Sequence, residues 1–260
     1  TKNFLRKEFI ASPRGNILDC HGALLATNKP IMTLCWQGTG NTRLTPEQCA
    51  IIDELNSILT LDLGNDSHGT AIKKAEKSKT QTPLYSNISL PLLSKVMEKY
   101  ANHPNISVQT TFQRHYPNNR LACHILGYIN NIDLDSIGKM GLEKLINTDL
   151  AGQKGTLIKT INSLGTHLEQ RELQKVQAGQ TIITTLDLGL QQIAESLFPE
   201  HYTGCFIIMD PENGALKTLI SRPNFDPALF LLPIYAETWQ SLKQGQPFLN
   251  RAFNALYPPA

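Results

Sequence analysis

One pattern in this chain matches a known arrangement for covalent catalysis, a serine three residues before a lysine: Ser136-Ile137-Gly138-Lys139. A serine hydroxyl is a poor nucleophile at neutral pH, and a lysine one helical turn away can accept its proton. However, Gly138 and Gly141 bracket the lysine, and no amphipathic helix follows. The Ser-x-Asn and Lys-Thr-Gly elements that complete such a site occur nowhere in the chain. We therefore interpret the pair as a chance match and predict no catalytic residue.

Signatures of metal and cofactor sites are also missing. The sequence has no His-Glu-x-x-His, no Gly-x-Ser-x-Gly and no glycine-rich phosphate loop, and its seven histidines are dispersed. The cysteines are odd in number, widely spaced and without a Cys-x-x-Cys pair, which favours buried or free thiols: Cys20, Cys35, Cys49, Cys123 and Cys205. These patterns predict no metal site and no cofactor. They leave the cellular compartment open.

The composition is that of an ordinary folded protein. Of the 260 residues, 41% are apolar and 18% are charged, and the formal net charge is +2. No stripe of lysine and arginine indicates a nucleic-acid partner. No run of about 18 apolar residues is present, and residues 1–7 are polar, so we expect neither a membrane span nor a signal peptide. The sequence indicates a soluble chain or a segment cut from a longer one.

The elements of the first part alternate between strand and helix patterns. Short β-like segments fill residues 8–36, and a helix begins at Pro46, with Thr45 and Gln48 as a capping box. Residues 64–82 are polar and lysine-rich, which predicts an exposed loop or weak helix with a solvated lysine face. A second helix is predicted with Ser89 as its cap. We interpret residues 37–112 as a small α/β subdomain inserted into a β-rich body.

The pattern changes near residue 180. Residues 181–186 predict a strand, Asp187 caps a helix with an apolar face, and a hairpin follows with its turn at 210–214. One helix and one hairpin do not easily cover each other's apolar faces, because a lone hairpin is marginal without further strands. We therefore expect the fold that begins near residue 181 to be incomplete.

Taken in order along the chain, several segments resemble the landmarks of class B penicillin-binding proteins, which are membrane-anchored peptidoglycan D,D-transpeptidases. The first set resembles the patterns Arg-Gly-x-Ile-x-Asp-x-x-Gly, Arg-x-Tyr-Pro, His-x-x-Gly-Tyr and Gly-x-Glu: Arg14, Gly15, Asp19, Gly22, Arg114, Tyr116, Pro117, His124, Gly127, Gly141 and Glu143. The second set resembles the start of the transpeptidase domain: Asp187, Gln191, Asn250 and Arg251. Each fragment alone is weak, and their order identifies the family.

The chain departs from the family pattern at three places. Cys20 and His21 stand where the family usually has Arg-Asn, and Ala228 replaces a usual Asn. The chain ends at Pro259-Ala260, where by resemblance a glycine and the nucleophilic serine would follow. The resemblance therefore implies a non-catalytic portion of the parent enzyme.

The resemblance implies an α+β fold with a β-rich pedestal over residues 1–180, a head insert at about 37–112, and the N-terminal fragment of a transpeptidase domain over 181–260. It implies a pedestal that positions the transpeptidase domain and docks partner proteins. The segments 137–143 and 239–242 are similar to the elongation type. The alternatives are the septal (cell-division) type, a natural non-catalytic periplasmic binding module, and a self-contained enzyme using Ser136 and Lys139.

The partners and location that the resemblance implies are those of cell-wall elongation. They are a membrane glycosyltransferase, a scaffolding protein and, for the full-length protein, the peptidoglycan precursor. No nucleic acid is expected. The implied location is the periplasmic face of the bacterial inner membrane, with an N-terminal anchoring helix that is absent from this chain.

Overall fold

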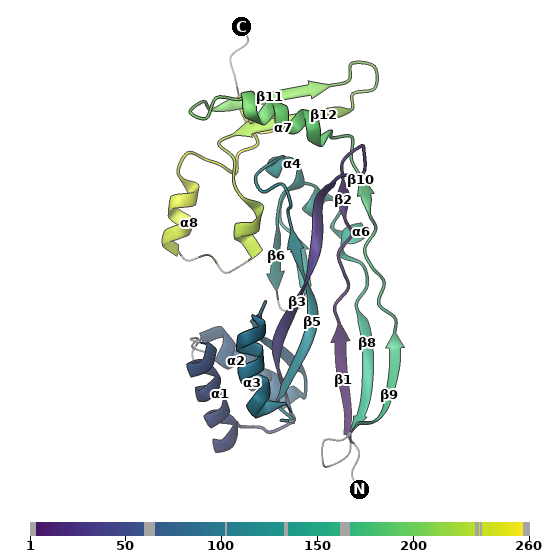
Figure 1. The fold of residues 1–260 in the computed structure, drawn as a ribbon, viewed down its shortest axis with the longest axis vertical. Coiled ribbons are helices and arrows are strands. Elements are labelled where there is room, and N and C mark those ends of the chain that lie inside the picture. The colour runs from purple at the N-terminus through teal and green to yellow at the C-terminus, as the bar shows by residue number, and fades with distance from the viewer. Residues whose placement is uncertain are drawn as a thin grey trace. The chain divides into compact units, whose positions relative to one another are not determined.

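The computed structural model describes residues 4–59, 66–101, 103–132, 135–161, 167–231, 234 and 236–256. The chain divides into two compact units, each built from three separate stretches of sequence. Unit 1 consists of Thr1–Ala11, Pro30–Phe112 and Lys154–Gln177, and unit 2 of Ser12–Lys29, Gln113–Gln153 and Ala178–Ala260. Helices and strands alternate in a mixed α+β architecture (Figure 1), as the sequence predicts. The predicted domain boundary at residue 180 stays a prediction.

The middle stretch of unit 1, Pro30–Phe112, forms a small α/β subdomain that we call the head. Its elements are α1 (Pro46–Leu59), α2 (Asp66–Ser78), α3 (Leu90–Tyr100), β4 (Gln81–Ser86) and most of β3 (Leu24–Gln37) and β5 (Ile106–His115). Both β4 and β5 pair with β3. The three helices lie beside these strands (Figure 1), and a shared core buries Leu34, Trp36 and Leu55 completely.

The two predicted helix caps of the head behave differently. At α1 the capping box is confirmed, because the Gln48 backbone N–H donates to Thr45 Oγ1 at 3.2 Å and the Thr45 N–H donates to Gln48 Oε1 at 2.9 Å. At α3, Ser89 occupies the predicted N-cap position, but its side chain makes no capping hydrogen bond. The second residue of that helix is Pro91, which has no N–H to offer to a capping oxygen.

The lysine-rich segment is more ordered than the sequence predicts. Residues 66–78 form the regular helix α2, and β4, which the sequence analysis missed, follows directly. The helix is stabilised by tertiary packing, because Ile72 and Ala75 are buried in the head core. Lys73, Lys74 and Lys77 are exposed, as a solvated face requires.

The rest of unit 1 is an antiparallel three-stranded sheet in the order β1 (Phe4–Ile10), β8 (Gly155–Ile161), β9 (His167–Gln174). The central strand β8 pairs with β1 from Phe4↔Ile161 to Ile10↔Gly155, and with β9 on its other edge. The strand β8 thus forms the middle of this sheet.

Unit 2 combines short elements from all three of its stretches. Its elements before residue 153 are β2 (Ile17–Leu18), α4 (Cys123–Leu126), β6 (Ile129–Ile132), β7 (Asp135–Gly138), α5 (Gly141–Leu145) and α6 (Asn147–Ala151). Its later elements are β10 (Ile182–Ile183), α7 (Leu188–Leu197), β11 (Gly204–Met209), β12 (Leu216–Arg222), η1 (Pro227–Leu231), α8 (Ala236–Lys243) and α9 (Arg251–Asn254). One core cluster, with Ile17, Leu126 and Leu150 at its centre, joins the three stretches.

The later part of unit 2 corrects one prediction and confirms two. The strand predicted over 181–186 is only Ile182–Ile183, because the chain must turn at Asp187 to begin α7. The capped helix and the β11–β12 hairpin are confirmed. The predicted apolar face of α7 is largely solvent-exposed, with Ile193 at 58% and Leu197 at 76%.

Within the residues that the structure describes, no helix has both the length and the apolar character that crossing a membrane requires.

Candidate functional site

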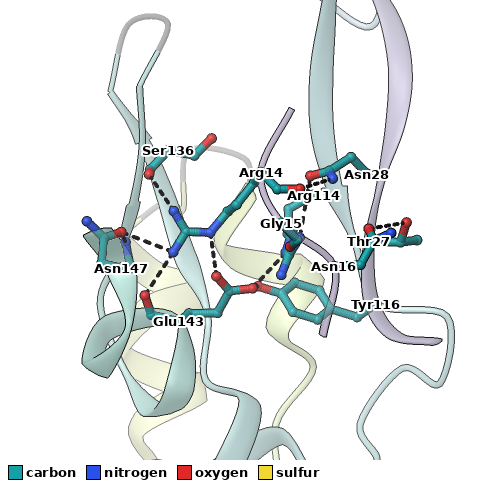
Figure 2. Close-up of polar contacts among 11 residues, drawn as sticks. Arg14, Gly15, Asn16, Thr27, Asn28, Arg114, Tyr116, Ser136, Glu143 and Asn147 are labelled. Atoms are coloured by element: carbon teal, nitrogen blue, oxygen red, sulfur yellow. Dashed lines mark hydrogen bonds and ion pairs between the residues drawn. The ribbon is translucent and has the colours of Figure 1, made fainter. Parts of the chain in front are cut away.

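Three motif residues that are far apart in the sequence meet inside unit 2 (Figure 2). Arg14 precedes β2, Arg114 lies near the end of β5, and Glu143 lies in α5. Arg14 Nε is 2.6 Å from Glu143 Oε2, and Arg114 Nε is 2.7 Å from Glu143 Oε1. All three side chains are buried, at 4%, 0% and 0% exposure for Arg14, Arg114 and Glu143. One carboxylate is therefore held between two guanidinium groups, an arrangement that we call the Glu143 cluster.

Further donors of the two arginines bind backbone and amide oxygens, whereas Arg114 Nη2 is buried without a hydrogen-bond partner among the described residues. Arg14 donates to Ser136 O at 3.1 Å, to Glu143 O at 2.8 Å and to Asn147 Oδ1 at 3.0 Å. Arg114 Nη1 donates to Gly15 O at 2.7 Å. A guanidinium has several donors in a fixed planar fork, which suits it to bridging several chain segments at once. The cluster thereby locks α5, β7 and the segments around residues 14 and 114 into one geometry.

The chemistry of the Glu143 cluster favours positioning over catalysis. Both carboxylate oxygens are occupied by arginines and sealed from solvent, so Glu143 has no free oxygen to act as a general base. Tyr116 lies beside it, with Oη 3.4 Å from Glu143 Oε1. Burial, and then the nearby carboxylate, raises the pKa of Tyr116, so the phenol stays neutral.

Close backbone approaches explain the glycines of the motifs. Gly15 donates its N–H to Leu150 O at 2.8 Å, and a Cβ at this residue would lie 1.8 Å from Gln180 O. Gly127 has φ +76°, and its Cβ would lie 1.8 Å from Met140 O, next to Gly141. Any side chain at these positions would collide with backbone, so only glycine fits.

A second group of motif residues surrounds the turn between β2 and β3, where Gly22 has φ +86°. Asp19 Oδ1 accepts from the backbone N–H groups of His21 at 2.9 Å and Ala23 at 2.7 Å, and its Oδ2 accepts from Leu188 N at 3.1 Å. Burial acts to raise the pKa of Asp19, but these three backbone donors outweigh it and leave the pKa below its ordinary value. Asp19 thus ties the turn to the start of α7.

Asp187 and Gln191 attach α7 to its surroundings. Asp187 Oδ1 accepts from Leu190 N at 3.0 Å, which confirms its predicted capping role. That hydrogen bond, with the nearby His21 side chain, holds the pKa of Asp187 below its ordinary value. The Gln191 amide donates to Leu219 O and accepts from Leu219 N, both at 3.0 Å, and so joins α7 to β12.

A third group lies near the end of the described chain. His124 Nε2 is 2.7 Å from Pro247 O, and burial lowers the pKa of His124, so a neutral ring donates this bond. Asn250 caps α9 by accepting from Ala252 N at 3.1 Å. The Arg251 guanidinium donates to Gly245 O and Gln246 O. Pro117 stands apart from all three groups, in an exposed turn after β5.

The geometry around Ser136 and Lys139 differs from that of a helical serine–lysine site. Ser136 lies in strand β7, which ends at Gly138, and pairs with Asn131 of β6. In a strand, residues three apart point to opposite faces, whereas a helix brings them to one side. Ser136 O instead accepts from Arg14, as part of the Glu143 cluster.

Sequence reasoning missed two polar residues with several partners. Asn147, which is half-buried at the start of α6, accepts at Oδ1 from Arg14 and from Gly138 N, and no sequence signal singled it out. Glu76, only 1% exposed, accepts from Trp36 Nε1 at 3.0 Å, Gln48 Nε2 at 3.1 Å and Asn105 Nδ2 at 3.1 Å. The period of Ile72 and Ala75 on α2 puts Glu76 on the buried stripe.

Comparison with known proteins finds similar proteins over most of the chain. A family model, the penicillin-binding protein dimerisation domain, matches residues 9–184. Peptidoglycan D,D-transpeptidase MrdA of Acinetobacter baumannii is 29% identical over an alignment of 275 positions, which covers 99% of this chain and 40% of that protein. This chain therefore spans well under half the length of that relative.

Solved structures match as well. A complex between a penicillin-binding protein (PBP2) and MreC from Helicobacter pylori gives a TM-score of 0.73 at 28% identity, over 98% of this chain and 50% of that one. A peptidoglycan synthase complex, described as coordinating polymerization and crosslinking, gives a TM-score of 0.61 at 26% identity, over 97% of this chain and 45% of that one. The family model covers more than half of the sequence, and it contains the residues of the Glu143 cluster. The chain belongs to the family of penicillin-binding proteins with a dimerisation domain.

Proposed function

We propose that this chain is the pedestal portion of an elongation-type peptidoglycan D,D-transpeptidase, which positions a transpeptidase domain and docks partner proteins. The observation that carries the proposal is the Glu143 cluster. It gathers ordered family motifs from residues 14, 114 and 143 into one buried, non-catalytic junction, in which both carboxylate oxygens of Glu143 are occupied. Such a junction fixes the relative geometry of chain segments, which is what a support for another domain needs.

The elongation type is supported by the relatives, which are named MrdA, and by a similar solved structure that contains MreC. The proposed partners are accordingly a scaffolding protein of the MreC kind and a membrane glycosyltransferase. The peptidoglycan precursor would be bound by the whole protein. The proposal places the chain at the periplasmic face of the inner membrane, with an N-terminal anchoring helix. It assigns residues 1–180 to the pedestal and 181–260 to the transpeptidase fold.

A fluorescent penicillin tests whether this chain has chemistry of its own. We expect no covalent adduct, because Ser136 and Lys139 lack the one-turn arrangement in which a lysine activates a serine. The matched control is Ser136→Ala, which should behave as the unchanged chain does. An adduct that forms on the unchanged chain and disappears in Ser136→Ala would establish a self-contained enzyme and overturn the pedestal proposal.

Partner docking is tested by binding the chain to an immobilised MreC-type protein from the same organism. Among the described residues of the head, the exposed large apolar side chains are Met32, Leu90 and Phe112. Because the burial of such side chains supplies much of the binding energy at interfaces, replacing all three by Gln should weaken binding at least about tenfold. The control is Leu145→Gln, at an apolar residue in unit 2 that is more exposed than any of the three. Binding only to a scaffolding protein of cell division would favour the septal type.

A further inference from the structure

Cys20, His21 and Asp187 bring three different metal-ligating groups together on unit 2. The Cys20 thiol, a ring nitrogen of His21 and a carboxylate oxygen of Asp187 all lie within 4.8 Å of one another. Cys20 and His21 are adjacent on the β2–β3 turn, whereas Asp187 is the N-cap of α7. The function proposed above uses none of these three groups.

The turn holds the two neighbouring ligands in a defined place. Cys20 N donates to Leu186 O at 2.8 Å, directly beside Asp187. Asp19 accepts from the N–H groups of His21 and Ala23, which fixes the path of the turn on the other side of Cys20. The backbone is therefore ordered before any ion binds, and the main adjustment left is in the side chains. The His21 side chain is 72% exposed, so it is free to move by the small distance required.

The carboxylates of Asp19 and Asp187 differ in their capacity to bind a metal ion. Both oxygens of Asp19 are used by backbone N–H groups, so Asp19 has a structural role. Asp187 uses Oδ1 for the helix cap, while Oδ2 faces His21 Nε2 at 3.2 Å. Asp187 is thus able to give one oxygen to an ion and still cap α7. The N-terminus of α7 carries partial positive charge, which disfavours a cation. The negative carboxylates of Asp19 and Asp187 lie at this helix end and offset that charge.

The ligand types select among metal ions. Mg²⁺ and Ca²⁺ prefer oxygen ligands alone, whereas thiolate with imidazole and one carboxylate suits Zn²⁺. Zn²⁺ binds these groups at about 2.0 to 2.3 Å, so tetrahedral ligand atoms lie about 3.3 to 3.8 Å apart. Because His21 Nε2 and Asp187 Oδ2 already lie 3.2 Å apart, a contraction from separations of up to 4.8 Å concerns the Cys20 thiol and requires side-chain rotation.

We propose that Cys20, His21 and Asp187 bind one Zn²⁺ ion, with a water molecule in the fourth position. By coordinate bonds, the bound ion joins the β2–β3 turn to Asp187, the N-cap residue of α7. It reinforces the junction that Asp19 makes with a single hydrogen bond to Leu188 N.

The test is equilibrium dialysis of the tag-free full chain against Zn²⁺ buffered by a chelator, with Co²⁺ as a spectroscopic probe. We expect one Zn²⁺ per chain, and a thiolate-to-cobalt charge-transfer band in the near ultraviolet. Cys20→Ser and Asp187→Asn should each weaken Zn²⁺ binding at least about 100-fold, because even the loss of an outer-shell partner costs about 10–100-fold. Asn is itself a good N-cap, so Asp187→Asn keeps α7 capped.

The matched controls are Cys49→Ser and Cys205→Ser, at the two exposed cysteines elsewhere in the chain. Both should bind Zn²⁺ as the unchanged chain does and keep the cobalt band. Zn²⁺ should also raise the Tm of the unchanged chain, but not that of Cys20→Ser. Three results would overturn the proposal: no Zn²⁺ bound by the unchanged chain, a cobalt band that survives in Cys20→Ser, or full affinity in Asp187→Asn.

Discussion

Glu143 in unit 2 and Glu76 in the head are both buried carboxylates, yet their partners are of opposite kinds. Glu143 lies between the charged groups of Arg14 and Arg114. Glu76 accepts hydrogen bonds from neutral groups, among them Trp36, Gln48 and Asn105. Burial acts to raise the pKa of Glu76, but hydrogen bonds from Thr39, Gln48 and Trp36 outweigh it, and the pKa lies below the ordinary value. Neutral dipoles are therefore sufficient to keep a buried carboxylate ionised.

The difference between the two sites determines what is left when the carboxylate is lost. Without Glu143, two guanidinium charges remain buried without a counter-charge, which is among the costliest defects in a protein interior. Without the charge of Glu76, only neutral donors lose a strong acceptor. The two glutamates are thus expected to differ more in the cost of substitution than in burial.

The largest effect is expected for Glu143→Gln. It should lower the free energy of unfolding by about 3–5 kcal/mol, because both buried arginines lose their charge partner. Urea unfolding followed by circular dichroism measures it. Glu172→Gln, on the exposed side of β9, is the control and should change stability by less than about 0.5 kcal/mol. If Glu143→Gln lowers the free energy of unfolding by less than about 1 kcal/mol, the charged partners of Glu143 do not distinguish it from Glu76.

A smaller effect is expected for Glu76→Gln, which keeps one acceptor oxygen but loses the charge. Hydrogen bonds to a charged group contribute about 1.5–3 kcal/mol, and we expect a loss within that range in the same urea experiment. Equal losses for Glu76→Gln and Glu143→Gln would show that the kind of partner does not matter.

The pH dependence of stability sharpens the head side of the comparison. The folded pKa of Glu76 lies below the ordinary value of 4.5, so its stabilisation is complete above that value and is lost as pH falls through the folded pKa. Urea unfolding between about pH 7 and about pH 3 should show the unchanged chain approaching Glu76→Gln in stability on the acid side. A constant difference between them over this range would show that Glu76 is not ionised in the folded state.

The smallest effect separates two helix caps of the head. Thr45→Ala should cost about 1 kcal/mol, because the threonine oxygen accepts from Gln48 N at α1. Ser89→Ala is the matched control at α3 and should be nearly neutral, since the Ser89 side chain makes no capping bond. Equal thermal unfolding midpoints for the two variants would contradict the difference between the caps.

Local signals were predicted well from the sequence, and distant contacts were not. The capping box at Thr45 and the hairpin after Asp210 depend on residues within a few positions of one another, so their patterns are readable directly. Arg14 and Glu143 were both identified by resemblance, but their meeting depends on a fold that brings residues 129 positions apart into contact. No local pattern encodes such a contact.

Burial was the least predictable property. Glu76 was missed because the surrounding lysines make the segment read as solvated, although Ile72 and Ala75 mark a buried stripe. The opposite error occurred at α7, where Ile193 and Leu197 share an apolar face that the structure leaves exposed. A helical pattern shows which residues share a face, but whether that face is covered depends on other parts of the structure.

The separation of 129 residues between Arg14 and Glu143 also has a consequence in time. At about 5–20 residues per second, synthesis of the intervening chain takes roughly 6–26 s. The head, Pro30–Phe112, is complete before Glu143 is made, so it is able to fold first. Until Glu143 is made, the Arg14 guanidinium lacks its carboxylate partner. The junction around Glu143 is therefore completed later in synthesis than the core of the head.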